Sequence, residues 1–436
     1  MGFWVILLRI GGISAEAIKL ALKGIMLANK GELDEAISNL RKAIELEPEY
    51  YEAYYHLGRL YVETKNYDEA TSLLNKIVEK YPNFSRAWAL LGDIEERMGN
   101  RERGTQLTLK AREMSRKADD LVRIGSELEA KGRLEEAKQK YIEATEADRS
   151  FPSGWYSLAH IYERLGEFEK ALEAFDSIIR LSPDDVFAWN KRVSVLKSLN
   201  RYNEAMASYD IMIEIDPRKK LFWFWKARTA EETGSINLAL ECCDRVLEMD
   251  PKDTYAMMYK AELLEKLGRY DEALGMYRKV LEIEPENKEA FSKFIEVHVD
   301  KLGKIDEAME IINKAIESDP EEPLYHYIKA TILMRQGKED EALQLLEKVV
   351  RIDMTYIDAW LRMAEIYEKR GEMAMASQCY EMITKVKASD PNAWYLRASF
   401  MAKIGKKKDA LKFLERALKL DPEFRPALEL KSKLSG

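Results

Sequence analysis

A proline recurs at a spacing of 34 in this chain of 436 residues, and four of these prolines follow one another without a gap: Pro183, Pro217, Pro251 and Pro285. Self-similarity at a fixed period of this size indicates an array of small supersecondary units rather than one globule. The chain is also longer than the roughly 250–300 residues at which a single hydrophobic core stops growing. We number each unit so that this proline is position 32.

Small residues recur at two further positions of the unit, and they predict a pair of closely crossing helices. Position 20 reads Ala36, Ala70, Gly104, Ala137, Ala171, Ala205, Ala239, Ala273, Ala308, Ala342, Ala376 and Ala410. Position 8 reads Gly24, Gly58, Gly92, Gly125, Ala159, Val193, Ala227, Ala261, Ile295, Ala330, Ala364 and Ala398. Small side chains at two fixed positions let two helix backbones approach and interlock.

Other positions mark the ends of these helices and fill their core. Position 15 is glycine except for Lys65 and Asn200, and glycine readily adopts the left-handed backbone that ends a helix. Proline at position 32 cannot continue a helical hydrogen-bond ladder. Aromatic residues fill positions 4 and 24: Trp88, Trp155, Trp189, Trp223, Trp360 and Trp394, then Tyr141, Phe175, Tyr209, Tyr277 and Tyr380. Each unit is therefore predicted to be helix–turn–helix.

These residues resemble the pattern of the tetratricopeptide-repeat (TPR) family, in which an aromatic, leucine and glycine precede alanine, an aromatic and proline. Twelve units in phase span residues 17–424. Lys226, Lys260 and Lys329 at position 7 are similar to prokaryotic, especially archaeal, members. The resemblance implies an all-α fold, a right-handed superhelical α-solenoid whose concave face is lined by the first helix of each unit.

The array is expected to divide into four parts, one of them set apart by an irregular unit. We expect an N-terminal apolar segment (1–16), units 1–3 (17–117), units 4–12 (118–424) and a C-terminal capping helix (425–436). The third unit is one residue short and has Gly104, Thr108 and Arg116 where alanine, an aromatic and proline are usual. Weak interface residues lower the coupling between neighbouring units of a stack, which predicts a soft point near residues 100–120.

The first residues are apolar but too few for a membrane span. Phe3 to Leu8 is ended by Arg9 and Gly11-Gly12, whereas a transmembrane helix needs about 20 apolar residues. A signal peptide needs a basic start and a longer apolar stretch. We expect this segment to cover the exposed end of the array or to be disordered, and we expect a cytoplasmic protein. A membrane contact through Phe3–Leu8 is kept as an alternative.

The sequence predicts neither a catalytic site, nor a metal site, nor a cofactor. Histidines fall in four different units, at His56, His160, His298 and His326, and a solenoid brings only neighbouring units into contact. Three cysteines without a CxxC pair indicate no disulfide framework or zinc site. No glycine-rich phosphate loop is present, and no residues remain outside the repeats for an enzyme domain.

Units 5–8 carry aromatic residues that the core pattern does not explain. By the family resemblance, positions 2, 5, 6, 9, 12 and 13 face the concave groove. The predicted groove residues are Tyr156, His160, Phe187, Asn190, Phe224, Trp225, Arg228, Tyr255 and Tyr259. Exposed apolar stripes mark interaction sites, and aromatics and arginine dominate interface energies. We expect protein or peptide partners here; partial burial between units, or a contact between two copies, would also account for these residues.

Charge and motif content rank the other functions. The net charge is -8, without the basic surface of nucleic-acid binders, so no nucleic acid is expected as a partner and an RNA-binding repeat is the least favoured function. A regulatory subunit of an enzyme and a membrane-associated assembly factor stay open. The carboxylate clamp of some family members, lysine at position 5 with asparagine at position 9, is absent. The partner and the oligomeric state do not follow from the sequence.

The irregular third unit gives a first testable expectation. Amide hydrogens of residues 100–120 should exchange faster than those of the helices in units 5–8, because the stack is least coupled there. Exchange measured by mass spectrometry on the intact chain would check this. Protection of residues 100–120 equal to that in units 5–8 would contradict it.

Overall fold

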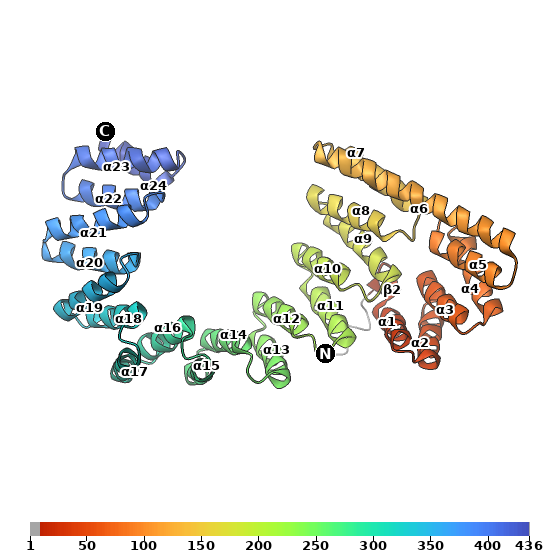
Figure 1. Ribbon diagram of the computed structural model, residues 1–436, viewed down its shortest axis with the longest axis horizontal. Helices are drawn as coiled ribbons and strands as arrows, with labels where there is room; N and C mark the ends of the chain where they lie inside the picture. The colour runs from red at the N-terminus through yellow and green to blue at the C-terminus, as the bar shows by residue number, and fades with distance from the viewer. Residues whose placement is uncertain (1–8, 436) are drawn as a thin grey trace. The chain divides into compact units, whose positions relative to one another are not determined.

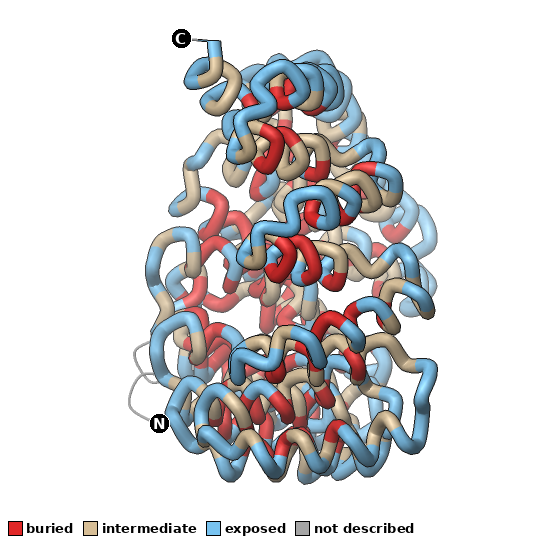
Figure 2. The backbone as a smooth tube through the Cα atoms, turned by 90° about the vertical axis from the view of Figure 1, so that its left-hand side faces the viewer, coloured by how far each residue is buried: buried red, intermediate tan, exposed pale blue. Residues whose placement is uncertain are grey.

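Helices in antiparallel pairs make up almost all of the described chain (Figure 1). The structure, a computed structural model, describes residues 9–435 and divides into two compact bodies between residues 259 and 260. We call these the N-terminal body and the C-terminal body. Along each helix, buried stretches alternate with exposed ones, as expected for helices that bury one face (Figure 2). The predicted all-α helical-repeat fold is confirmed.

The N-terminal body begins with a small hairpin, in which β1 (Arg9–Ile10) pairs antiparallel with β2 (Ile13–Ser14). Its helices are α1 (Ala15–Asn29), α2 (Leu33–Leu46), α3 (Tyr51–Glu63), α4 (Tyr67–Lys80), α5 (Ser85–Arg97), α6 (Arg101–Ala130), α7 (Leu134–Ala147), α8 (Pro152–Leu165), α9 (Phe168–Leu181), α10 (Val186–Ser198), α11 (Tyr202–Ile215), α12 (Lys220–Glu232) and α13 (Ile236–Met249). The division between the bodies falls within α14 (Thr254–Lys266).

The C-terminal body continues the helix pairs and ends in a single helix. Its elements are α15 (Tyr270–Ile283), α16 (Lys288–Glu296), the π-helical turn η1 (Val297–Lys301), α17 (Ile305–Ser318), α18 (Pro323–Arg335), α19 (Glu339–Ile352), α20 (Ile357–Arg370), α21 (Met373–Val386), α22 (Pro391–Lys403), α23 (Lys407–Leu420) and α24 (Arg425–Ser435). The turn η1 lies in the unit with one inserted residue, and a π-turn absorbs such an insertion. Helix α24 packs on α22 and α23, with Leu434 turned to the core and Leu428 exposed.

Backbone geometry confirms the predicted turns at position 15. The glycines there have positive φ, and so do the two residues that replace them: Lys65 at 63° and Asn200 at 58°. These are the non-glycine residues with positive φ within residues 9–435. The left-handed turn is thus required by the fold at every unit, whatever side chain stands there.

The close helix crossing at positions 8 and 20 is also confirmed. A Cβ atom on Gly125 would lie 2.4 Å from the ring of Tyr141, and one on Gly92 would lie 2.9 Å from the carbonyl oxygen of Gly104. At Gly58 the nearest atoms would be 3.4 Å away, an ordinary contact. Glycine is therefore needed at some crossings, whereas alanine would fit at others.

Polar bonds at fixed repeat positions tie several helix pairs to their neighbours. The indole Nε1 of each position-4 tryptophan donates to a carbonyl six residues earlier, at 2.8–3.1 Å; in Trp88, Trp189 and Trp223 that carbonyl belongs to the position-32 proline. A cation at position 7 bonds a side chain 16 residues earlier, as in Lys226–Asp210 at 2.5 Å. The same relation holds for Arg192–Asp176, Lys329–Asn313 and Arg397–Glu381.

One long helix replaces the predicted junction between the third and fourth units. Helix α6 runs without a break for 30 residues, so the predicted boundary between residues 117 and 118 falls inside it. The physical reason is visible in the sequence, because Arg116 stands where proline would stop the helix. Its buried residues are all small and recur every seventh position: Gly104, Ala111, Ala118 and Gly125.

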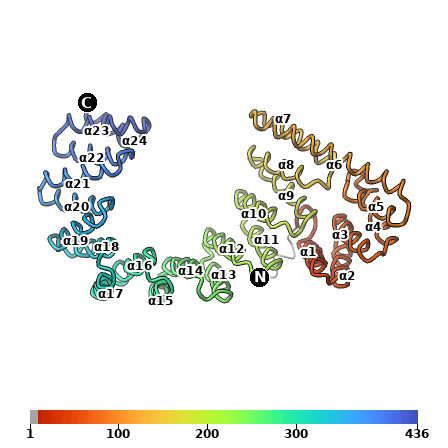
Figure 3. Tube along the Cα trace, viewed as in Figure 1, coloured from red at the N-terminus to blue at the C-terminus, as the bar shows by residue number. Residues whose placement is uncertain are grey.

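The N-terminal body is closed on itself, which corrects the expectation that units contact only their neighbours. Tyr50 Oη donates to the Arg180 carbonyl at 3.2 Å, His56 Nε2 lies 3.1 Å from the Leu181 carbonyl, and Glu52 pairs with Arg180 at 2.8 Å. Helix α11 likewise lies beside α1 (Figure 3).

The hairpin residues 9–14 fill this closure. Ile10 and Ile13 are buried, and Gly11 N donates to Asp176 Oδ2 on α9 at 2.8 Å. The apolar segment Phe3–Leu8 lies outside the described residues. Within the described chain, none of the helices combines the length and the apolar character needed to cross a bilayer.

Substituting glycine at two crossings should have opposite effects on stability. We expect Gly125→Ala to lower the free energy of unfolding by about 1–3 kcal/mol, because overpacking displaces the Tyr141 ring. Gly58→Ala should leave it unchanged or raise it by up to about 1 kcal/mol through helix propensity. Urea unfolding of both variants would check this, and equal midpoints would contradict it.

The buried His56 predicts a pH dependence. Burial, with Arg59 and Arg86 nearby, lowers the pKa of His56 to about 4 from the ordinary 6.5. Between pH 6.5 and pH 4 the unfolded chain binds a proton at His56 and the folded chain does not. The contribution of neutral His56 to the free energy of unfolding is therefore fully present above pH 6.5. It is lost as the pH falls toward 4, by roughly 3 kcal/mol in total.

The test compares unfolding at pH 7 and pH 5. His56→Gln keeps a donor for the Leu181 carbonyl but does not titrate, so its loss of stability between these pH values should be smaller than that of the wild type. Leu109→Ala, at an exposed residue without a titratable group, is the control and should lose as much as the wild type. Identical losses in all three proteins would disprove a role for His56.

Candidate functional site

All nine predicted groove residues lie in the N-terminal body, on the first helices of four successive pairs. Tyr156 and His160 are on α8, and Phe187 and Asn190 are on α10. Helix α12 carries Phe224, Trp225 and Arg228, and the start of α14 carries Tyr255 and Tyr259. We call the surface formed by these helices the aromatic face.

A pocket of about 570 Å³ opens at one end of the aromatic face. Its lining comes from α6, α7, α8, α9 and α10: Ser126, Glu129, Tyr141, Tyr156, Ser157, His160, Glu163, Phe175, Phe187 and Lys191. The structure thus brings three predicted residues, Tyr156, His160 and Phe187, into one concave site.

The apolar wall of this pocket is formed by Tyr156 and Phe187, and Phe175 packs behind Tyr156. The rings of Tyr156 and Phe187 are 5.6 Å apart, and Phe175 packs against Tyr156 at 6.5 Å. Tyr156 Oη donates to Asp185 Oδ2 at 2.6 Å, and burial together with this bond raises the pKa of Tyr156. Tyr156 therefore stays a neutral donor, while Phe187 is 57% exposed and free to meet a partner.

Glu129 forms the polar side of the pocket. It accepts hydrogen bonds from Tyr141 Oη at 2.8 Å and from Arg164 at 2.6 Å, and His160 Nε2 lies 3.4 Å away. Burial acts to raise the pKa of Glu129, but the bonds from Arg164 and Tyr141 outweigh it and the pKa is lowered. A charged carboxylate therefore faces the pocket at neutral pH.

The predicted site residues did not include Glu129 or Tyr141, although Glu129 is at position 12, one of the expected groove positions, and Tyr141 is at the aromatic position 24. Tyrosine at position 24 donates to glutamate at position 12 of the same unit, and the pair recurs as Tyr277–Glu265 and Tyr380–Glu368. The recurrence indicates a structural bond that also places a carboxylate on the groove side of the first helix.

A second aromatic pair repeats the first along the face. Phe224 at position 5 meets Tyr255 at position 2 of the next unit, with rings 5.0 Å apart in an edge-on arrangement. Tyr156 and Phe187 occupy the same two positions two units earlier. Tyr255 is 64% exposed, and Leu221, at position 2 of the unit between, is 45% exposed. The outer residues therefore form a row on successive helices.

The remaining predicted residues contribute less open surface. Trp225 is partly buried against Phe222, with ring centroids 5.9 Å apart. Tyr259 Oη donates to Glu231 at 2.6 Å, and burial and this bond raise its pKa. Asn190 is half-buried and Arg228 is exposed. Position 6 is thus partly structural here.

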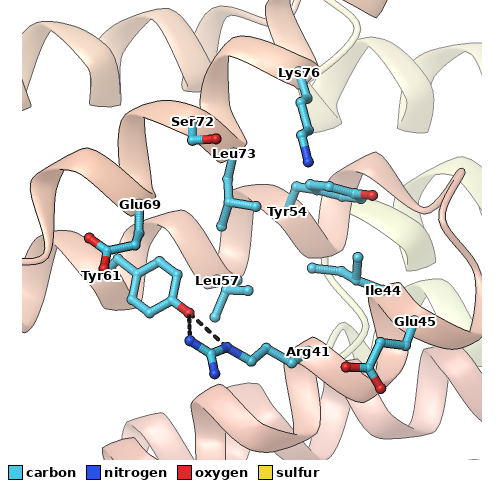
Figure 4. A pocket seen from close by; sticks show the side chains of 10 residues that line it. All are labelled: Arg41, Ile44, Glu45, Tyr54, Leu57, Tyr61, Glu69, Ser72, Leu73 and Lys76. Carbon is cyan, nitrogen blue, oxygen red and sulfur yellow. Dashed lines mark hydrogen bonds between the residues drawn. The ribbon is translucent and has the colours of Figure 1, made fainter.

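Two further pockets lie away from the predicted residues. One, of about 330 Å³, is formed by α2, α3 and α4 (Figure 4). Its floor includes Leu57 and Leu73, and Arg41 donates to Tyr61 Oη at 2.8 Å. The other, of about 500 Å³, includes the Lys226–Asp210 pair.

The structure offers little for metal or thiol chemistry in its described part. Among residues 9–435, no three histidine, cysteine, aspartate or glutamate side chains lie together in a way that could hold a metal ion. The cysteines are free and buried, and burial raises the pKa of Cys242 to about 11 and that of Cys379 to about 12. Both of these thiols stay protonated at neutral pH.

Comparisons with known proteins identify the repeats. Family models described as tetratricopeptide repeat match residues 27–94, 122–186, 188–219, 226–288, 264–332, 333–404 and 391–434. No curated protein matches the sequence.

Solved structures of similar arrangement have low sequence identity. The APC/C hetero-tetramer Cut9–Hcn1 is 13% identical, with 95% of each chain covered and a TM-score of 0.34. Yeast Tom70 is 16% identical, with 96% of this chain and 95% of that chain covered and a TM-score of 0.42. Naa15/Naa10 bound to HypK-THB is 14% identical, with 95% and 85% covered and a TM-score of 0.37.

The hydrogen bond from Tyr156 to Asp185 can be tested by removing the Tyr156 hydroxyl. Tyr156→Phe should lower the free energy of unfolding by about 1 kcal/mol, because Asp185 Oδ2 loses its donor in a partly buried site. Tyr255→Phe is the matched control and should change nothing, because that side chain is largely exposed. Equal unfolding curves for Tyr156→Phe and the wild type would show that the bond does not hold the wall.

Proposed function

Because the chain belongs to the tetratricopeptide-repeat family, we propose that it is a non-catalytic scaffold that binds protein or peptide partners on the aromatic face. Repeats of this family generally mediate protein interactions. The class of partner and the binding surface on this chain are our proposal. A cytoplasmic location is part of the proposal, since all three cysteines are free thiols, as is usual in reducing compartments.

The repeated aromatic pair is the observation that carries this proposal. In each pair the position-5 ring is partly buried and the position-2 ring is open: Phe224 supports Tyr255 as Tyr156 supports Phe187. Exposed large apolar side chains in a row lower solubility unless they are used. Aromatic side chains held rigidly from behind are the residues that dominate binding energy at interfaces.

The spacing of the exposed side chains also indicates the conformation of a partner segment that would fit them. Phe187, Leu221 and Tyr255 occupy the same position on successive first helices, and packed helices lie about 8–10 Å apart. A polyproline II segment advances about 3.1 Å per residue with three residues per turn, so every third side chain lies on the same side at about 9 Å. We therefore propose a polyproline II segment with apolar side chains at every third residue, one of them entering the pocket beside Glu129.

Removing the second aromatic pair should abolish partner binding. Phe224→Ala with Tyr255→Ala deletes both rings without touching the buried core, and the loss should be at least about 2 kcal/mol, as for interface hot spots. Leu109→Ala is the matched control, an exposed apolar residue of the same body outside the aromatic face.

The measurement is affinity capture from the source cells with identification by mass spectrometry, followed by titration of each captured protein. Proteins held by the wild type and by Leu109→Ala should be absent with the double variant. Unchanged capture and unchanged affinity in the double variant would remove the aromatic face as the binding site. Circular dichroism of each variant confirms that the helices are intact.

A further inference from the structure

The groove positions of the first two units are buried, unlike those of units 6–8. At position 2, Ile18 is 0% and Glu52 is 3% exposed, whereas Phe187 and Tyr255 are more than half exposed. At position 6 of the second unit His56 is 7% exposed. The same face of the repeat is therefore open in one part of the N-terminal body and covered in another.

Over Glu52 and His56 the cover is a segment of the same chain, the last turn of α9. The carbonyls of Arg180 and Leu181 are at the helix C-terminus, where no intrahelical donor remains. Tyr50 Oη donates to the first carbonyl at 3.2 Å, and His56 Nε2 lies 3.1 Å from the second. Tyr50 and His56 thus cap a helix that is more than a hundred residues away in sequence.

An ion pair between Arg180 and Glu52 accompanies these two hydrogen bonds. The guanidinium of Arg180 bonds both carboxylate oxygens of Glu52, at 2.8 and 3.0 Å, and the Gly11 carbonyl at 3.1 Å. Both partners of the ion pair are buried, so each needs the other to offset the loss of hydration. The surface therefore fits a helix C-terminal turn with an arginine as its penultimate helical residue.

The fit of the present occupant is incomplete. Two buried nitrogen atoms at this contact have no hydrogen-bond partner among the described residues: His56 Nδ1 and Arg180 Nε. Since Nε2 of His56 is the donor toward Leu181, its Nδ1 is a buried acceptor without a donor. Unsatisfied buried polar groups weaken a contact, so a ligand that supplied a donor here would bind this surface better than α9 does.

We propose that the first-helix face of α3, beside the β1–β2 hairpin, is a second binding surface, specific for an arginine-bearing helix C-terminus, which the chain keeps occupied with its own α9. A partner helix of the same chemistry binds it by displacing α9. The surface shares no residue with the aromatic face, so the two proposals fail independently.

The test uses the full chain and a peptide of residues 168–181, amidated at its C-terminus and labelled with a fluorophore. Arg180→Met in the chain removes the ion pair on the α9 side and leaves Tyr50, Glu52 and His56 in place. The peptide should bind this variant and bind the wild type far more weakly. If about 1% of wild-type molecules are open, the difference in apparent Kd is about 100-fold.

Two controls assign the binding to the arginine and its carboxylate. The doubly substituted chain Arg180→Met/Glu52→Gln should lose the peptide, and a peptide with Arg180→Ala should not bind any chain. The cost of ordering a short peptide as a helix is the same for every chain, so differences in Kd report the surface. Equal peptide binding by the wild type and Arg180→Met, or binding by neither, overturns the proposal.

Opening itself is measured by the distance between spin labels at Lys23 on α1 and Arg218 after α11, both exposed. The distance should be short and narrow in the wild type and should lengthen in Arg180→Met. The charge-swapped chain Glu52→Arg/Arg180→Glu should restore the short distance, which separates opening from misfolding. An unchanged distance in Arg180→Met overturns the proposal, because the surface would then stay closed without its ion pair.

Discussion

Close contact between two helix backbones is the constraint on which the rest of this structure depends. Where a Cβ atom on Gly92 or Gly125 would meet backbone or ring atoms within 3 Å, no larger residue fits without a shift. The crossing fixes the angle of each helix pair. Each pair then has an apolar face that it cannot bury alone, so pairs must stack. Fixed polar bonds, such as Trp189 to the Pro183 carbonyl, set how they stack.

The aromatic face follows from this stacking, because the bonds that fix the pairs also position the groove residues. The Asp185 side chain accepts from Ala188 N at the start of α10, and its other oxygen accepts from Tyr156. One carboxylate thus caps a helix and steadies the ring on which Phe187 packs. A partner would meet rings whose positions are set before binding, so little entropy is lost when it binds.

Local features of the fold could be predicted from the sequence, and distant contacts could not. Each turn, crossing and cap depends on residues within one unit or its neighbour, so the 34-residue pattern contains them all. The bonds from Tyr50 and His56 to Arg180 and Leu181 join segments that no periodicity relates. For the site, the exposed rings followed from repeat positions, whereas Glu129 entered the pocket through a structural bond to Tyr141.

The path of α6 bears on the closure of the N-terminal body. Arg116 removes the proline stop, so the second helix of the third unit continues as the first helix of the fourth and no turn separates them. The chain then cannot stack the fourth unit on the third as elsewhere. Asp148, in the loop after α7, accepts hydrogen bonds from Ser85 and Ser115, and Tyr50 beside α3 bonds the last turn of α9. The covered groove positions thus lie before the irregular unit, and the open ones lie after it.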